Sequence, residues 1–350
     1  MLVDSPPKQS AEPQSAPASR KRHLLRATGL LVAVGVLLLV CVASIVVGAK
    51  SIPLADVWHG LFDNQGSGND VIVADVRVPR TLLGLIAGAA LGLAGAVMQA
   101  LTRNPLAEPG LLGVNAGASA AVVSAISFLG VTSLTGYVWF AFLGAGVVSV
   151  LVYILGGSRS ATPVRLALAG TAATAALYGY INAVQLLDSA ALERLRFWTV
   201  GSLASADMET IGKVAPFIGA GVLLALLLAR PLNAMEMGDD TARSLGAHLN
   251  RTRALSMLAV TLLCGAATAA CGPIIFIGLM IPHLVRSITG PDMRWILPYA
   301  TVLAPVLLLG ADVVGRVVTR PAELQVGIVT ALIGGPVFIH LVRRKRMAQL

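Results

Sequence analysis

The sequence predicts an all-α integral membrane protein with about ten transmembrane helices. Of its 350 residues, 56% are hydrophobic and only 12% are charged, and the mean hydropathy is +0.81. Soluble domains carry about 25% charged residues, so most of this surface is expected to face lipid. Long uncharged runs recur along the chain, and a spanning helix needs about 20 apolar residues. Both ends of the chain are basic, which is typical of cytoplasmic termini.

The uncharged runs locate the expected helices in order along the chain. Six of them have the length of about one span: 27–49, 81–102, 166–187, 214–229, 295–311 and 324–342. The run 109–158 is long enough for two spans, which divide near 131–136. The run 254–285 is too long for one span, and 271–273 divides it into a full helix and a shortened one. These divisions give ten helices, and the same pattern is compatible with nine to eleven.

The distribution of positive charge predicts the orientation in the membrane. Basic residues cluster before the first run, at 20–26, and after the last, at 343–346. An even number of spans puts both termini on one side, and the positive-inside rule makes that side cytoplasmic. Threading the chain from there puts 18 of the 26 lysines and arginines on the inner side. The net charge of +9 is therefore a topology signal, and no nucleic-acid partner is expected.

The domain organisation is simple. Residues 1–22 predict a disordered basic cytoplasmic tail, and residues 23–346 a single transmembrane domain. No signal-peptide cleavage pattern is present, and the first apolar run is long enough to remain as an anchor. The three cysteines lie in apolar segments without metal-ligand spacing. We expect them to pack in the core, with no metal site and no cofactor.

Small residues predict how the helices pack. Gly84, Gly88 and Gly92 follow one another at spacing four within the run 81–102, and Gly95 comes next. They share one helical face, and this arrangement lets helix backbones approach closely in lipid. The pattern predicts a multi-helix bundle and carries no information on a substrate.

A polar, turn-forming segment, TRNPLAEPGLLGVNAG, interrupts the apolar sequence at 102–117. Its turn-forming and polar residues are Asn104, Pro105, Glu108, Pro109 and Gly110. Non-helical backbone at membrane depth persists only inside protein or beside a water-filled cavity. Physical reasoning alone supports two interpretations equally, a structured element beside a pathway and an ordinary cytoplasmic loop.

Three long motifs resemble one protein family. RVPRTLLGLIAGAALGLAGAVMQALTRNPLAEPGLLGVNAGA occupies 77–118, GPIIFIGLMIPHLVR occupies 272–286, and GADVVGRVVTRPAELQVGIVTALIGGPVFI occupies 310–339. In this order they resemble the FecCD-type permeases, which are membrane subunits of ABC importers for iron–siderophore complexes, haem and vitamin B12. The resemblance implies the type II ABC importer permease fold, in which helices 2–5 and 7–10 are inverted repeats. It also implies a translocation path at the interface of two permease subunits.

The energy source is expected to lie outside this chain. The sequence has no GxxxxGK[ST] motif for binding nucleotide phosphates. The resemblance therefore implies two copies of an ABC ATPase subunit and an extracytoplasmic substrate-binding protein. It also implies a second permease, either a copy of this chain or a homologue. The chain itself is expected to be a transporter subunit and not an enzyme.

The inner connection at 231–253 is the expected contact with the ATPase. Asp239 or Asp240 can cap a short helix that Gly246 closes. The resemblance implies that this helix couples ATP hydrolysis to transport, and the alternative is a solvated loop with a chance helix. The predicted coupling residues are Gly238, Asp239, Ala242, Leu245 and Gly246.

Three arginines, Arg77, Arg80 and Arg316, stand on the expected outer side. Arg77 and Arg80 are three residues apart, so a helical start puts both on one face. In the family, arginines at the matching positions pair with glutamates of a substrate-binding protein, and guanidinium suits carboxylate recognition. Interfacial anchoring is the alternative interpretation. Asp312 lies at i−4 from Arg316 and is a possible ion-pair partner for it.

Polar side chains recur at helical spacing along the run 166–187, where they trace one face. They are Thr171, Thr174, Tyr178, Asn182 and Gln185. The resemblance implies that this helix flanks the translocation path, while hydrogen bonding between helices explains the stripe about equally well. Gln99 and Asn115 are further candidates for the lining or for an inner gate.

The sequence thus predicts an inner-membrane permease subunit that imports an iron–siderophore or a related metal chelate, driven by a separate ATPase. The alternative function is a secondary transporter that uses an ion gradient. That alternative predicts acidic or cation-coordinating residues inside the membrane. No mid-span chain of Asp, Glu and His is present in the sequence.

Overall fold

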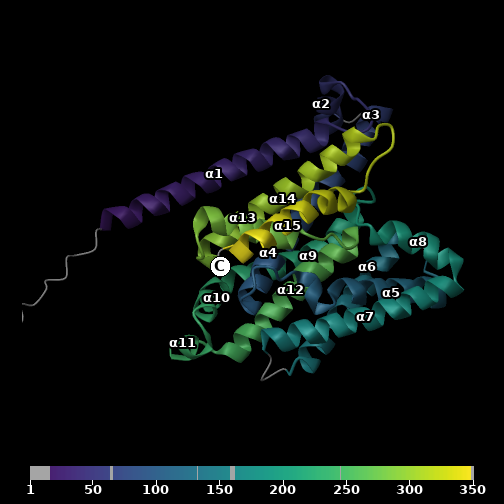
Figure 1. The fold of residues 1–350 in the computed structure, drawn as a ribbon. Coiled ribbons are helices and arrows are strands. Elements are labelled where there is room, and N and C mark those ends of the chain that lie inside the picture. The colour runs from purple at the N-terminus through teal and green to yellow at the C-terminus, as the bar shows by residue number, and fades with distance from the viewer. Residues whose placement is uncertain (1–15, 64–65, 132, 158–161, 245, 348–350) are drawn as a thin grey trace, which may run out of the picture.

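A computed structural model describes residues 16–63, 66–131, 133–157, 162–244 and 246–347 (Figure 1). Every regular element within these ranges is a helix, as predicted. Seven helices are long and apolar enough to cross a membrane, and three shorter apolar helices accompany them. Helix α1 begins at Ala16, so part of the predicted tail is helical, while residues 1–15 lie outside the described residues.

Ten helices follow the predicted apolar runs. They are α1 (Ala16–Val46), α4 (Val78–Thr102), α5 (Val114–Leu129), α6 (Leu134–Leu155), α7 (Pro163–Leu187), α9 (Met208–Leu227), α12 (Leu249–Cys271), α13 (Ile277–Thr289), α14 (Met293–Val318) and α15 (Val326–Met347). The predicted divisions of the two long runs are confirmed, because α5 gives way to α6 near residue 131 and α12 ends at Cys271. The number of membrane crossings itself stays a prediction.

Short helices connect the long ones. They are α2 (Leu54–Phe62), α3 (Gly68–Val71), η1 (Ile72–Arg77), η2 (Pro109–Leu112), α8 (Ser189–Thr199), α10 (Ala229–Glu236) and α11 (Asp239–Ser244). Only α11 is expected from the sequence, because a search for uncharged runs of span length passes over short helices that carry charges. Helix α8 starts where the Asp188 carboxylate accepts hydrogen bonds from the amides of Ala190 and Ala191.

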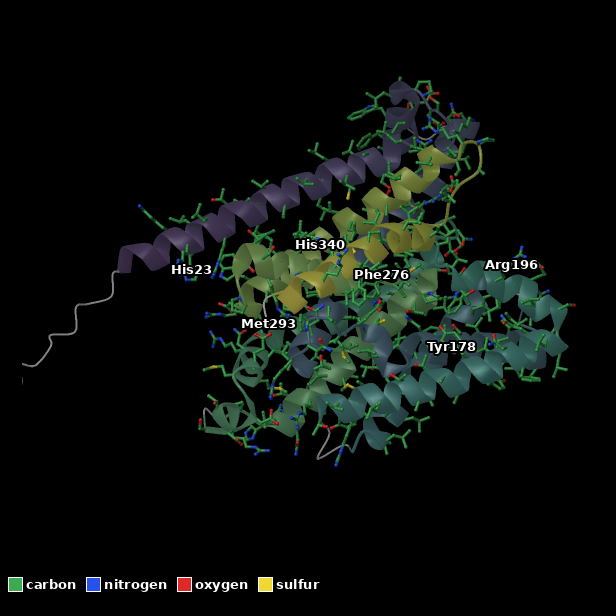
Figure 2. All side chains as sticks on the ribbon, in the orientation of Figure 1. His23, Tyr178, Arg196, Phe276, Met293 and His340 are labelled. Atoms are coloured by element: carbon green, nitrogen blue, oxygen red, sulfur yellow. The ribbon has the colours of Figure 1, made fainter. Side chains whose placement is uncertain are left out.

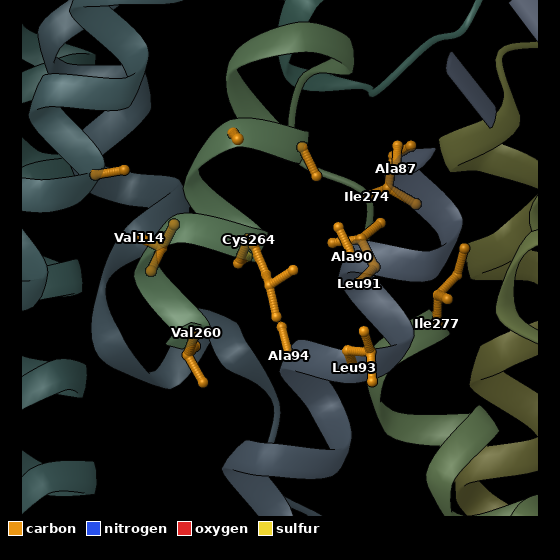
Figure 3. Packing of buried hydrophobic residues seen from close by; sticks show 14 of the residues in the cluster. Ala87, Ala90, Leu91, Leu93, Ala94, Val114, Val260, Cys264, Ile274 and Ile277 are labelled. Atoms are coloured by element: carbon orange, nitrogen blue, oxygen red, sulfur yellow. The ribbon is translucent and has the colours of Figure 1, made fainter. Parts of the chain in front are cut away.

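Helix α4 is the centre of the bundle and packs against α9, α12, α13 and α14. A Cβ atom added to Gly88 would lie 2.6 Å from the Cα of Pro305, and one added to Gly95 would overlap the carbonyl of Gly278. The glycine face therefore permits direct backbone contact with α14 and α13, as its spacing predicts. Small and branched apolar side chains of α4, including Ala90 and Ala94, fill the space toward α12 (Figure 3).

Most of the remaining long helices form two groups around α4 and α12, while α9 packs against α4 and α12 themselves and α15 packs against α13 and α14. Helices α5, α6 and α7 pack together on one side, and α1, α13 and α14 lie on the other (Figure 1). The order of elements repeats, since α4 and α12 are each followed by a break and a short helix of 16 or 13 residues. This repetition agrees with the predicted relation between helices 2–5 and 7–10.

Candidate functional site

The three predicted docking arginines come together where α4 begins and α14 ends. We call Arg77, Arg80, Asp312, Arg316 and Glu323 the outer cluster. The Asp312 carboxylate lies 2.8 Å from Nη2 of Arg80 and 3.1 Å from Nη2 of Arg316. Arg80 also donates to Oε2 of Glu323 at 2.6 Å. The suggested i+4 pair of Asp312 and Arg316 is confirmed.

The outer cluster is buried except for Glu323, whose side chain is 34% exposed. Arg77 and Arg80 are 4% exposed, Arg316 is 2% exposed and Asp312 is fully buried. Arg77 donates to main-chain carbonyls at the end of α1, and Arg316 donates to Ser44. Each guanidinium group thus has partners within the chain, as a buried charge requires, and docking of a binding protein at these arginines stays a prediction. The cluster therefore joins α1, α4 and α14.

At the opposite end, residues 229–247 form a compact unit that we call the coupling segment. It consists of α10 and α11, and the predicted short helix is confirmed as Asp239–Ser244. Gly246 adopts φ +81°, its amide donates to Arg243, and the next amide donates to Ala242. This is the left-handed helix ending for which glycine is suited. Gly238 has φ +105°, Ala242 is buried, and Leu245 lies outside the described residues.

Ion pairs fix the coupling segment to the helices that surround it. The Asp239 carboxylate pairs with Arg103, which ends α4, and lies 2.7 Å from Nη2 of Arg253 in α12. Burial raises the pKa of Asp239, but the hydrogen bonds and charges of the two arginines outweigh it and lower that pKa. The segment is thereby attached to both central helices of the bundle.

Two further contacts attach the coupling segment to α13 and α14. Glu236 accepts from Nη2 of Arg286 at 3.1 Å. Asn233 donates to Asp292 at 2.7 Å and accepts from the amide of Met293 at 2.8 Å. Sequence reasoning missed these partners because they are 50 to 60 residues apart in the chain. The one feature of the sequence that could have indicated these contacts is that single charged residues stand at the inner ends of apolar runs.

The two helix breaks, 103–113 and 272–276, meet inside the bundle. Oε1 of Glu108 accepts a hydrogen bond from the amide of Phe276 at 3.0 Å, and Phe276 has φ +71° (Figure 2). Ala107 and Leu112 are fully buried on either side of Glu108. The segment predicted at 102–117 is thus a structured element, with η2 at its centre. Its position beside a pathway stays a prediction.

The helical structure of that segment explains its turn-forming residues. Oδ1 of Asn104 accepts a hydrogen bond from the amide of Leu106 at 2.9 Å. This bond closes a turn that contains Pro105. Pro109 occupies the first position of η2, where its missing N–H costs nothing. Gly110 accepts from the amide of Gly113, which ends η2. The inner-side motif therefore folds as its residue types suggest.

Gln99 does not reach an open surface. It is 1% exposed, and its amide nitrogen donates to the carbonyls of Gly278 and Leu279. Its amide oxygen accepts from Arg286 at 3.2 Å. The polar atoms of Gln99 are therefore used between α4 and α13, and its role in the lining or in an inner gate stays a prediction.

A hollow of about 540 Å³ lies between α5, α7, α15 and the break 272–276. Asn115 and Tyr178 line it, and Tyr178 is 45% exposed (Figure 2). Asn115 also accepts a hydrogen bond from Thr268 at 3.0 Å. The hollow therefore unites two of the predicted path residues with a helix break.

The other polar residues of α7 lie along the same helix and outside the lining of the hollow. Thr171 and Asn182 are exposed, while Thr174 and Gln185 are half-buried. The Thr171 hydroxyl donates to Ala167 one turn earlier in its own helix. Most of α7 is exposed in this single chain, so its polar stripe is available to a neighbouring molecule or to a path.

Comparisons with known proteins agree with this architecture. The FecCD transport family matches residues 36–344. The ferric enterobactin transport system permease protein FepD of Escherichia coli (strain K12) is 49% identical over 317 residues, which cover 89% of this chain and 94% of the relative. The hemin transport system permease protein HmuU of Yersinia pestis is 36% identical over 318 residues, which cover 89% and 93%.

A solved structure of a metal-chelate type ABC transporter in an inward-facing conformation has the same fold. The two chains align with a TM-score of 0.81 at 27% sequence identity, covering 91% of this chain and 99% of the other. The family match spans almost all ten long helices, and the relatives extend over nearly their full length. This chain belongs to the FecCD transport family.

Proposed function

We propose that this chain is the permease subunit of an ABC importer that carries an iron–siderophore complex across the cytoplasmic membrane. The observation that carries the proposal is the likeness to the ferric enterobactin permease, which is 49% identical over 89% of this chain. The chain performs no chemistry on its cargo. Its work is to hold a path and to change which side of the membrane that path faces.

The coupling segment supports an external ATPase as the energy source. In the proposed assembly, two ATPase subunits bind the α10–α11 units of two permeases and move them when ATP closes the ATPase dimer. Asp239 and Glu236 would carry that motion inward, because each is ion-paired to a helix of the bundle. Both termini would lie on the same cytoplasmic side as this segment.

A substrate-binding protein would dock at the opposite end, over the outer cluster. Because the arginines of the cluster are already paired within the chain, a carboxylate of the binding protein would have to replace Glu323 as a partner of Arg80. Glu323 is suited to such an exchange because its side chain is 34% exposed, whereas Asp312 is fully buried. A Glu323→Gln variant should therefore bind the binding protein more tightly, and unchanged binding would exclude the exchange.

The path would follow the polar stripe of α7 and the hollow beside Tyr178 and Asn115. A second permease, either a copy or a homologue, would face the exposed sides of α7 and α15 and complete the wall. A path bounded by hydroxyl and amide groups suits a large polar chelate, which passes without being held tightly. The buried Asp312 is ion-paired with two arginines and is therefore not free to bind a coupling ion.

Transport by purified components tests this function. The chain, reconstituted in liposomes with its ATPase and loaded binding protein, should accumulate ⁵⁵Fe-enterobactin only when ATP is supplied on the ATPase side. The chain alone should accumulate none. Accumulation by the chain alone under a sodium or proton gradient would replace the proposal with a secondary transporter.

A further inference from the structure

Pro282 explains why α13 needs the side chain of Gln99. In a regular helix the carbonyl of Gly278 accepts from the amide of residue 282, but proline has no N–H. Nε2 of Gln99 donates to that carbonyl at 3.2 Å and to the carbonyl of Leu279 at 3.1 Å. A buried carbonyl without a donor costs free energy, so Gln99 supplies from α4 what α13 lacks.

The other end of the Gln99 amide is attached to the coupling segment through one guanidinium group. Nη1 of Arg286 donates to Oε1 of Gln99 at 3.2 Å, and its Nη2 donates to Glu236 at 3.1 Å. Glu236 is the last residue of α10. The fixed fork of a guanidinium transmits a displacement of one partner to the other better than a flexible ammonium would.

The beginning of α13 is held by the other helix break. Glu108 accepts from the amide of Phe276 at 3.0 Å, and Phe276 precedes Arg286 by ten residues, or about 15 Å of helix. The main-chain carbonyl of Gln99 also accepts from the amide of Asn104, where the break 103–113 begins. Polar contacts therefore run from the coupling segment to Asn104, and four residues of main chain lead from there to Glu108, where the breaks meet.

Close packing gives α13 a point about which it can turn. Gly278 lies directly on Gly95 of α4, with no side chain between the two backbones. Gln99 holds the same turn of α13 to α4 by its hydrogen bonds. A short helix fixed near its first turn and pulled at its last turn acts as a lever, with Arg286 on the long arm and Phe276 on the short arm.

We propose that Gln99 and Arg286 are positioning residues that transmit movement of the coupling segment to the contact between Glu108 and Phe276. The inference rests on the proposed function, since the movement originates in the ATPase. Displacement of Glu236 draws Arg286, α13 turns on its Gln99 contact, and the Glu108–Phe276 hydrogen bond shifts beside the hollow. Coupling of this kind requires a contiguous element that both sites can bias, and α13 is that element.

Hydrogen exchange of the α13 amides tests the proposal. The chain is purified with the ATPase that accompanies it, placed in lipid nanodiscs and compared with and without ATP plus vanadate. In the unaltered complex, exchange of peptide 277–289 should respond to trapping. In Gln99→Leu that response, normalised to the ATPase trapped, should fall about fivefold or more. Glu236→Gln, which changes a half-buried carboxylate to an amide of the same size, should weaken the response in the same direction.

Two matched variants show whether the loss is specific. Thr102→Val removes a buried hydroxyl that bonds only to Met98 of its own helix among the described contacts. Glu209→Gln removes an exposed carboxylate at the start of α9, outside the coupling segment, that pairs with Lys213. Both should leave the α13 response unchanged. A fall as large as that in Gln99→Leu would make the effect structural and would overturn the proposal.

The remaining outcomes separate this inference from the function on which it rests. If no ATPase accompanies the unaltered chain, the proposed function is wrong. If the unaltered complex hydrolyses ATP and α13 does not respond, or if Gln99→Leu responds like the unaltered complex, the function stands and the role of Gln99 and Arg286 is wrong.

Discussion

Carboxylate–arginine pairs occur at both ends of the bundle, but the two ends differ in how far these pairs are exposed to solvent. In the outer cluster, Asp312 and its two arginines are at most 5% exposed, and they join helices that need not separate. At the coupling segment, Asp239 and Arg103 are 32% and 35% exposed, and Glu236 and Arg286 are 24% and 20% exposed. Buried pairs are expensive to break, whereas half-exposed pairs exchange readily with water. We therefore expect the outer end to stay together and the coupling segment to rearrange more readily.

Removing Asp312 should produce the largest effect. Asp312→Ala leaves Arg80 and Arg316 buried without their shared carboxylate, which should cost about 3–5 kcal/mol of unfolding free energy. Equilibrium unfolding of the purified chain in mixed detergent micelles measures this free energy of unfolding. Glu323→Gln removes only the exposed partner of Arg80 and should cost far less. Equal losses in the two variants would show that burial does not distinguish these partners.

Removing Asp239 should have a smaller effect on stability. Asp239→Ala frees Arg103, which is 35% exposed, and also removes the carboxylate from Arg253, which is only 9% exposed, so we expect a loss of about 2 kcal/mol. The same unfolding measurement applies, with the fully exposed Asp240→Ala as the control that should change nothing. A loss as large as that of Asp312→Ala would remove the contrast between the two ends.

The smallest expected effect is a loss of folding stability at acid pH, to which Asp292 contributes. Hydrogen bonds from Arg294 are the main cause that lowers the pKa of Asp292 from 3.8 to about 2. Because the folded-state pKa is the lower one, Asp292 stabilises the folded chain above about pH 4, and this contribution disappears as the pH falls toward 2. Asp292→Asn should therefore lose less stability than the unaltered chain over that interval. Parallel pH profiles would contradict the assignment.

Sequence reasoning located the elements that depend on local pattern. Apolar runs gave the ten long helices, Cys271–Pro273 gave the shortened α13, and Gly246 gave the end of α11. The i+4 pair of Asp312 and Arg316 was also accessible, since both residues lie on one helix face. Each of these features is determined within about one or two helical turns.

Features that depend on how helices rotate against one another could not be predicted in this way. Arg80 finds Asp312 across 232 residues, and Gln99 finds Arg286 across 187 residues. Whether an arginine at a helix end is exposed or buried depends on how the neighbouring helices pack around it, and composition does not encode that packing. Sequence reasoning therefore made Gln99 a candidate for the lining or an inner gate without identifying these partners. The missing N–H of Pro282, four residues after Gly278, was the one local sign that α13 needs an outside donor.

The contact of Gly88 with Pro305 limits how the molecule can change shape. Gly84, Gly88 and Gly92 bring α4 against α14 over successive turns, and such an extended contact without intervening side chains from α4 cannot accommodate sliding or turning, so we expect α4 and α14 to travel as one rigid frame. The contact of Gly95 with Gly278 is confined to one turn of α13 and still allows α13 to turn on it. We expect alternation between the two faces of the membrane to involve the helices outside that frame, which include α5, α6 and α7 as well as α13. A hinge for such a swing is available where α4 gives way to η2, at the left-handed residue Arg103.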